Sequence, residues 1–244
     1  MKIIRKAAVA GTFYPRYKPD LLNTLEESFT NKEFGPGEAP KSLNQEQRTI
    51  IGGVSPHAGY IYSGCCAAFT YLNLFKERIP DTVIILGTDH IGYGKVALMK
   101  DGEWETPLGN LFIDDNLSNK ILENSNTIIE DESAFIGFPY GREHNIEVQL
   151  PFIKSCAQDK DVKILPIKVA VKEFNLLDKI STDIASIINS YSKDVVIIAS
   201  SDMTHKEISN VEGLNKFKER DQKVIDSFIE FNPEKTLKTA SSTT

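Results

Sequence analysis

The sequence predicts an α/β protein whose sheet is covered by helices on both faces. Segments rich in β-branched residues alternate along the chain with segments whose apolar residues recur at helical spacing, as in α/β folds. The strand candidates are short apolar runs without polar alternation, which is typical of strands buried on both faces. The 244 residues, 41% hydrophobic and 25% charged, suit one large domain, and we expect a single domain over residues 1–244.

The predicted strands are spread over most of the chain. Four uninterrupted apolar runs are the expected core strands: Ile50–Val54, Thr82–Gly87, Lys163–Val169 and Asp194–Ser200. Two further strands, Val96–Met99 and Leu111–Ile113, lie on either side of the turn signal Pro107-Leu-Gly109.

The predicted helices lie before, between and after these strands, and each has its apolar residues on roughly one face. They span Leu21–Phe29, Cys65–Phe75, Leu117–Glu123, Ile146–Ala157, Leu176–Tyr191 and Leu214–Phe231. The stretch Asn31–Gln47, rich in Gly, Pro, Asn, Glu and Lys, predicts an exposed loop.

Charge and cysteine content exclude several classes of protein. With 28 basic and 34 acidic residues the net charge is −6, so we expect no nucleic-acid partner. No apolar run approaches the roughly 20 residues that a membrane span needs. Cys65, Cys66 and Cys156 contain no C-x-x-C spacing, and neither a disulfide framework nor a zinc ribbon is expected. We see no signal peptide and expect a cytoplasmic protein without membrane partners.

Three of the four histidines follow predicted core strands. His57 comes just after the first, His90 just after the second and His205 just after the last. Because ligands of open α/β sheets lie beyond the carboxyl ends of the strands, these side chains could converge although they are far apart in sequence. His144 opens a predicted helix instead, where it shares a face with Glu147.

Converging histidines favour a metal site. Neutral imidazole binds first-row metals, an oxygen ligand can complete the shell, and a further histidine could move protons. A histidine taken alone after a strand is more often a hydrogen-bonding loop residue, so the shared position of the set carries the prediction. Neighbouring residues in these motifs are expected to line the pocket: Ser55, Tyr60, Asp89, Ser201 and Thr204.

Other chemistries find less support. Gly52, Gly53 and Gly59 form neither a G-x-G-x-x-G nor a P-loop pattern, so no nucleotide cofactor is expected. No serine lies in a G-x-S-x-G motif, which disfavours a serine hydrolase.

Six segments in order carry a family resemblance. They are Arg5-Lys-Ala-Ala-Val-Ala-Gly-Thr-Phe-Tyr-Pro15, Pro56-His-Ala-Gly-Tyr60 with Ser63-Gly64, Leu86-Gly-Thr-Asp-His90, Trp104-Glu-Thr-Pro-Leu-Gly109, Glu143-His-Asn-Ile-Glu-Val-Gln-Leu-Pro151 and Ser200-Ser-Asp-Met-Thr-His205. Together they resemble the Memo family, whose archaeal and bacterial members are often called AmmeMemoRadiSam system protein B.

The resemblance implies both a fold and a site. The fold is a three-layer αβα sandwich with a central, mostly parallel or mixed sheet, similar to LigB-type class III extradiol dioxygenases, which use non-haem iron. The implied cofactor is a divalent metal, iron or copper, held by two histidines that map onto His57 and His90 and by a cysteine position that maps onto Thr204. By the same analogy His144 is the acid/base group, oriented by Glu143 or Glu147.

The chain departs from the family pattern in two places. A hydroxyl at Thr204 is a weaker ligand for Cu(I) than a thiolate, so Asp202 or His205 would have to complete the shell. The family pattern continues with a Gly-rich stretch and a final strand, whereas this chain ends in the polar tail Lys238–Thr244. We expect that this C-terminal segment is lacking and that an open sheet edge would favour homo-oligomers.

Three functions follow as hypotheses. The first is metal-dependent, dioxygenase-like oxidation of a small aromatic or another redox substrate. The second is a non-catalytic module that binds a small molecule, peptide or partner in the same pocket, and the third is a zinc-dependent hydrolase. Fold analogy alone does not decide whether the protein is an enzyme.

Overall fold

A computed structural model describes residues 3–208 and 210–243. The chain divides into two compact units, which are described separately. The first comprises Met1–Lys172 and Leu176–Ser201, and the second comprises Glu173–Asn175 and Asp202–Thr244. The expected single domain over residues 1–244 stays a prediction.

The first unit is built around a six-stranded sheet. Its strand order is β2-β9-β3-β8-β4-β7. The strands are β2 (Gly52–Ser55), β3 (Thr82–Gly87), β4 (Val96–Leu98), β7 (Ile129–Glu130), β8 (Lys163–Val169) and β9 (Val195–Ser200). The four strands predicted as core strands are neighbours in this sheet and run parallel. The antiparallel pairing of β4 with β8 makes the sheet mixed.

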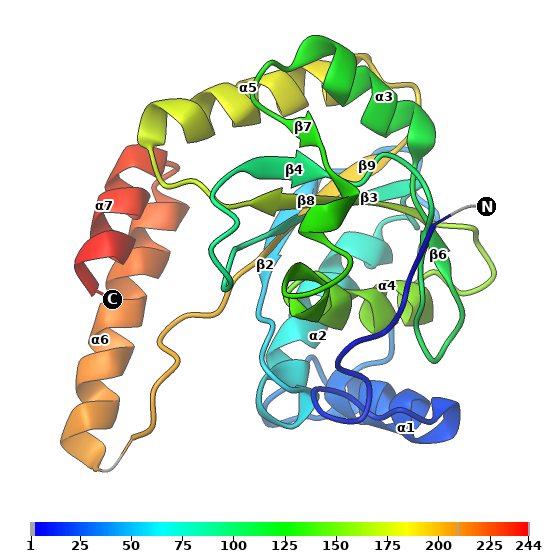
Figure 1. Ribbon diagram of the computed structural model, residues 1–244. Coiled ribbons are helices and arrows are strands. Elements are labelled where there is room, and N and C mark those ends of the chain that lie inside the picture. Colours follow the sequence, from blue (N-terminus) through cyan, green and yellow to red (C-terminus); the bar gives the residue numbers. More distant parts are fainter. Residues whose placement is uncertain (1–2, 209, 244) are drawn as a thin grey trace. The chain divides into compact units, whose positions relative to one another are not determined.

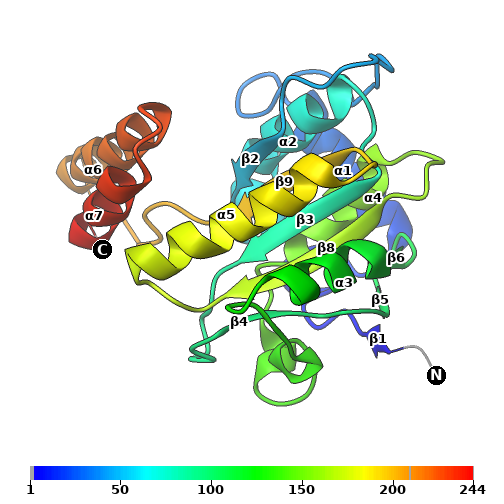
Figure 2. The same cartoon turned by 90° about the horizontal axis from the view of Figure 1, so that it is seen from above.

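Helices cover both faces of this sheet (Figures 1 and 2). On one face lie α3 (Asp115–Asn124) and α5 (Phe174–Ser190), and on the other lie α2 (Tyr60–Lys76) and α4 (Leu150–Cys156). Helix α1 (Lys18–Thr30) packs against α2 and α4. The central strands β3 and β8 are almost entirely buried between the two layers, as their uninterrupted apolar sequences predict. The three-layer αβα sandwich is therefore confirmed.

A small second sheet ties the N-terminal segment to the first unit. Its order is β1-β5-β6, with β1 (Ile4–Arg5), β5 (Glu103–Trp104) and β6 (Leu111–Phe112). Trp104 is fully buried there, under the guanidinium of Arg5 at 4.3 Å from the ring centroid. This contact and the parallel pairing of β1 with β5 hold the N-terminal strand in place.

Two segments differ from the prediction, one expected to be a single helix and one expected to be a polar tail. The helix expected over Ile146–Ala157 is a 3₁₀ turn, Glu147–Gln149, followed by α4, and Pro151 lies in the first turn of α4. Proline has no N–H and fixes φ, so it suits a helix start. The second unit consists mainly of two helices, α6 (Val211–Ile229) and α7 (Pro233–Thr243), which pack together. The expected polar tail is thus helical through Thr243, while Thr244 lies outside the described residues.

Within the described part of the chain, no helix combines the length and apolar character needed to cross a bilayer.

Candidate metal centre

Three histidines of the first unit meet at the carboxyl edge of the sheet. His57 follows β2 and His90 follows β3, two parallel strands whose ends lie at the same edge. His144 comes from the loop before α4 and stacks on His90, with ring centroids 5.2 Å apart and an angle of 6° between the planes. The His57 ring centroid lies 5.1 Å from that of His90 and 6.0 Å from that of His144. Of the three strand-end histidines predicted to converge, His57 and His90 lie next to each other, and the convergence of His205 with them stays a prediction.

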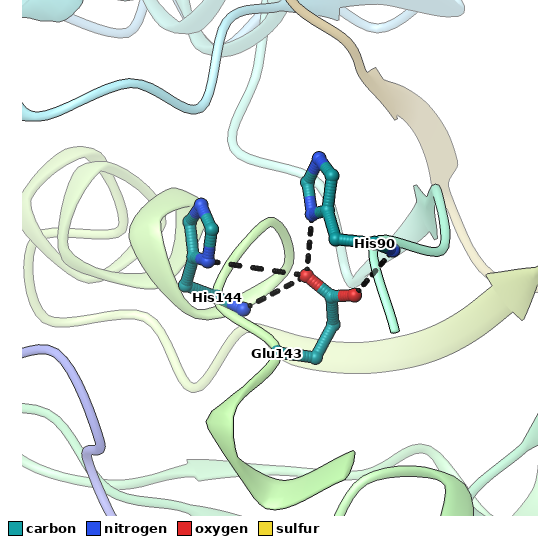
Figure 3. A group of neighbouring side chains, drawn as sticks. All are labelled: His90, Glu143 and His144. Atoms are coloured by element: carbon teal, nitrogen blue, oxygen red, sulfur yellow. Dashed lines mark hydrogen bonds and ion pairs between the residues drawn. The ribbon is translucent and has the colours of Figure 1, made fainter. Parts of the chain in front are cut away.

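The carboxylate of Glu143 lies at the base of the stacked pair (Figure 3). It accepts hydrogen bonds from the Nδ1 and backbone N–H of His90, at 2.8 and 2.9 Å, and from the backbone N–H of His144 at 3.1 Å. Burial raises the pKa of Glu143, but the His90 hydrogen bonds and the nearby positive charges outweigh that effect and bring the pKa to about 2. Glu143 is therefore an ionised carboxylate at neutral pH.

This geometry assigns the tautomer of His90. An ionised carboxylate can only accept, so His90 Nδ1 must carry the proton that it donates to Glu143. In neutral His90 the lone pair then lies on Nε2. Figure 3 shows that Nδ1 of both His90 and His144 faces Glu143, while the second nitrogen of each ring points to the opposite side. A carboxylate behind a histidine in this way is the usual support of a metal-ligating imidazole.

A separate network assigns the tautomer of His57. Ser200 Oγ donates its one proton to the backbone oxygen of Asn145 at 2.7 Å and accepts from Gln149 Nε2 at 2.9 Å. The contact of 3.1 Å between His57 Nδ1 and Ser200 Oγ must therefore be donated by His57. The lone pair of neutral His57 is again on Nε2, as metal ligation through that atom requires.

The donor set fits a metal ion. One ligand atom each from His90, Glu143 and His144 lie within 4.8 Å of one another. Because Glu143 and Ser200 already engage the Nδ1 atoms of His90 and His57, a bound ion would use the Nε2 lone pairs of these rings, with Glu143 as the supporting carboxylate behind His90. His57 adjoins this cluster through its contact with His90. Imidazole and carboxylate together suit iron, copper and zinc.

Glu147, one of the two carboxylates expected to orient His144, is bound by residues of the N-terminal segment. It is fully buried and its two oxygens accept from Arg5 Nη1, Tyr14 Oη and the backbone N–H groups of Ala8 and Val9. All four donors belong to the N-terminal segment, and both oxygens of the Glu147 carboxylate accept from it. The carboxylate near His144 is that of Glu143, with Oε1 4.0 Å from His144 Nδ1.

The predicted ligands that follow β9 lie in the second unit. His205 Nδ1 is 3.0 Å from Asp202 Oδ2, and the hydroxyl of Thr204 donates to Asp221 at 2.6 Å. The ligand role of Asp202 or His205, and the pocket position of Thr204, stay predictions.

The expected pocket residues of the first unit make hydrogen bonds to backbone groups. Tyr60 Oη donates to the backbone oxygen of Val148, and Ser201 N–H donates to the backbone oxygen of Ser55. Asp89 accepts from successive backbone N–H groups, Ile91 to Tyr93, and so shapes the loop that carries His90.

Three residues near the cluster were not predicted. Phe13 lies against His144, with ring centroids 4.2 Å apart, and Ser200 holds His57. Lys168 is fully buried in β8. Phe13 and Ser200 lie within the motifs that carry the family resemblance, and Lys168 is a lysine inside an apolar strand.

Known proteins resemble the chain over most of its length. A sequence profile described as Memo-like protein matches residues 5–244. A MEMO1 family protein of Ignicoccus hospitalis is 36% identical over 233 residues, which are 95% of this chain and 78% of that protein. Another, of Desulfurococcus amylolyticus, is 41% identical over 204 residues, 83% of this chain and 70% of that protein. A third, of Nitrosopumilus maritimus, is 37% identical over 235 residues, 96% of this chain and 78% of that protein.

Proposed function

The chain belongs to the Memo-like protein family, and on that premise we propose that its histidine cluster binds a divalent metal ion, iron or copper, and oxidises a small aromatic or another redox substrate. The observation that carries the proposal is the meeting of the His57, His90 and His144 rings, with the ionised Glu143 behind His90 and His144. A bound iron or copper ion would supply redox chemistry that amino-acid side chains lack.

The residues of the chain have distinct tasks in this proposal. His57 and His90 would hold the ion through Nε2, because Ser200 and Glu143 occupy the Nδ1 side of each ring. Glu143 keeps His90 oriented and offsets the positive charge of the ion. His144 would give or take a proton at Nε2, since its Nδ1 faces Glu143 and its ring stands parallel to His90.

Exposure at the site suits a small ligand. The side chain of His90 is 43% exposed and that of His144 is 24% exposed, whereas Glu143 is 5% exposed. A ligand that approaches the histidines from solvent would therefore meet the Nε2 side, with the carboxylate protected behind the rings. Phe13 covers one side of His144 and would limit access of water there.

Elemental analysis of the protein purified without added metal tests the binding part of the proposal. We expect iron or copper, and we expect His57→Ala and His90→Ala each to lower Fe(II) affinity at least about tenfold. His205→Ala is the matched histidine control, and an equal loss there would add His205 to the ligand set, as the sequence predicts. Wild-type protein without affinity for any divalent metal would overturn the proposal and favour a non-catalytic binding module.

Oxygen uptake tests the chemical part. The protein is loaded anaerobically with Fe(II) and offered a panel of catechols with O₂. Consumption of O₂ that His144→Ala slows without loss of iron would support the proposed proton-transfer role. No uptake with iron demonstrably bound would remove the oxidation, and zinc in the purified protein would favour a hydrolase.

A further inference from the structure

Lys168 is a buried charge that the proposed function does not use. It is the penultimate residue of β8 and is fully buried, and its Nζ has no hydrogen-bond partner among the residues that the structure describes. It pairs in register with Gly87 of β3 and with Ala97 of β4. Small residues on both neighbouring strands leave room for a long side chain on a crowded sheet.

Three aromatic rings surround the ammonium group. Lys168 Nζ lies 5.1 Å from the ring centroid of Tyr140, 5.5 Å from that of Tyr93 and 5.9 Å from that of Phe135. These distances are within the range of cation–π attraction, which is stronger where water is excluded. The three rings therefore stabilise the positive charge of Lys168.

The segment that carries His144 continues over the face of the sheet from which Lys168 rises. A Cβ added to Gly87 would lie 2.3 Å from Asn145 Oδ1, so Asn145 covers the sheet at that position. Side chains paired in register point to the same face, and the Lys168 side chain therefore rises on the face that Asn145 covers. Asn145 directly follows Glu143 and His144 in the chain.

Two carboxylates act on this lysine. Burial lowers the pKa of Lys168, and the negative charges of Glu143 and Asp89 oppose that effect. The influence is mutual, because the charge of Lys168 also lowers the pKa of Glu143. An ionised carboxylate that is 5% exposed needs a nearby positive charge, since an uncompensated buried charge is strongly destabilising.

We propose that Lys168 is the buried counter-charge of Glu143, a positioning residue that stabilises the carboxylate behind His90 and tunes the charge of the metal site. The inference rests on the proposed metal binding. The proposal predicts the direction of the electrostatic effect. The positive charge of Lys168 lowers the affinity of the cluster for a divalent cation and raises its affinity for an anion bound to that cation.

Lys168→Met tests the sign, because methionine fits an aromatic cage without carrying charge. With Co(II) as the probe, we expect the variant to bind the cation about tenfold more tightly than wild type, since a unit positive charge near a divalent ion is removed. Azide affinity of the Co(II)-loaded variant, read from the visible spectrum, should fall by a similar factor. Lys163→Met is the matched control, at the opposite end of the same strand with a side chain 29% exposed, and should change neither value.

The pattern of the two affinities separates charge from packing. Co(II) and azide affinities that both fall would indicate that Lys168 only maintains the shape of the site. Affinities that do not change would indicate that the charge of Lys168 has no electrostatic effect on the bound ion. Either result overturns the proposal. If Lys168→Met does not fold, Lys168→Gln serves for the same measurements.

A double-mutant cycle tests the pairing without metal. We expect the losses in free energy of unfolding to be non-additive when wild type, Lys168→Met, Glu143→Gln and the double variant are compared. The double variant should be more stable than the sum of the two single losses predicts. The cycle with Lys163→Met in place of Lys168→Met should be additive, and an additive Lys168 cycle overturns the pairing. Wild-type protein that binds no Co(II) would overturn the proposed function, and the cycle then decides the pairing by itself.

Discussion

Replacing Glu147 by Gln should destabilise the first unit strongly. The carboxylate is fully buried and accepts four hydrogen bonds, from Arg5 Nη1 at 2.5 Å, Tyr14 Oη at 2.8 Å and two backbone N–H groups at 2.9 Å. Glutamine keeps one acceptor oxygen and places an NH₂ group against two of these donors. It also leaves Arg5, which is 3% exposed, without its counter-charge.

The magnitude follows from these contacts. Each hydrogen bond to a charged group contributes roughly 1.5–3 kcal/mol, and breaking a buried ion pair by removing one partner costs about 3–5 kcal/mol. Arg5 still donates to backbone oxygens of Glu143 and Phe135, at 2.7 and 3.3 Å, which limits the loss. We therefore expect a loss of about 3–4 kcal/mol, or a fall in Tm of roughly 10 °C for a chain of this size.

Urea and thermal unfolding followed by circular dichroism measure this loss. Glu105→Gln is the matched control, because Glu105 pairs with Lys6, the residue after Arg5, at 2.6 Å, but both side chains are exposed. The exposed pair should contribute less than about 1 kcal/mol. A loss for Glu147→Gln no larger than that of Glu105→Gln would refute the assignment of Glu147 as the buried anchor of the N-terminal segment.

Three further predictions concern the residues around the cluster. The folded pKa of Glu143, about 2, is lower than its ordinary value of 4.5, so its contribution to stability is complete above pH 4.5 and is lost as the pH falls toward 2. The Tm of wild type should therefore fall more steeply over this range than the Tm of Glu143→Gln. Parallel curves of Tm against pH would contradict the assigned ionisation. Ser200→Ala removes the acceptor of His57 Nδ1 and should lower Fe(II) affinity roughly tenfold with an unchanged circular dichroism spectrum; calorimetry that gives wild-type affinity would count against the assigned tautomer. Gly87→Ala places a Cβ 2.3 Å from Asn145 Oδ1 and should cost about 1–3 kcal/mol in urea unfolding, whereas Gly59→Ala, whose nearest neighbour would be 3.5 Å away, should be nearly neutral; equal losses would show that the contact at Gly87 relaxes freely.

Much of the fold could be predicted from local sequence patterns. The strands Thr82–Gly87 and Lys163–Val169 have the predicted bounds, and the runs ending at Val54 and Ser200 differ from β2 and β9 by one or two residues. Buried parallel strands need uninterrupted apolar residues, so their positions can be predicted without knowing which strands they pair with. The helix α7 was not predicted, because its sequence is short and polar, with Leu237 as its one large apolar side chain.

The site could be predicted only in part. The position of His57 and His90 after successive core strands of the sequence indicated that they converge, because parallel strands end at a common edge. The sequence left Glu143 and Glu147 as equal candidates to orient a histidine. The two carboxylates are four residues apart on a bent segment, and their directions depend on which distant segment each one faces.

The sequence by itself determined the order of the core strands and of the helices between them, the edge at which the histidines gather and the family to which their motifs point. Only the tertiary structure decided that Glu143 supports His90 across 53 residues of chain, that Glu147 anchors Arg5 across 142, and that Lys168 lies inside an aromatic cage. Strand and helix formation depend mainly on residues that are close in the chain, so the periodicity of apolar residues predicts these elements. The partner of a buried charge is set by the packing of remote segments, for which a single sequence has no local signal.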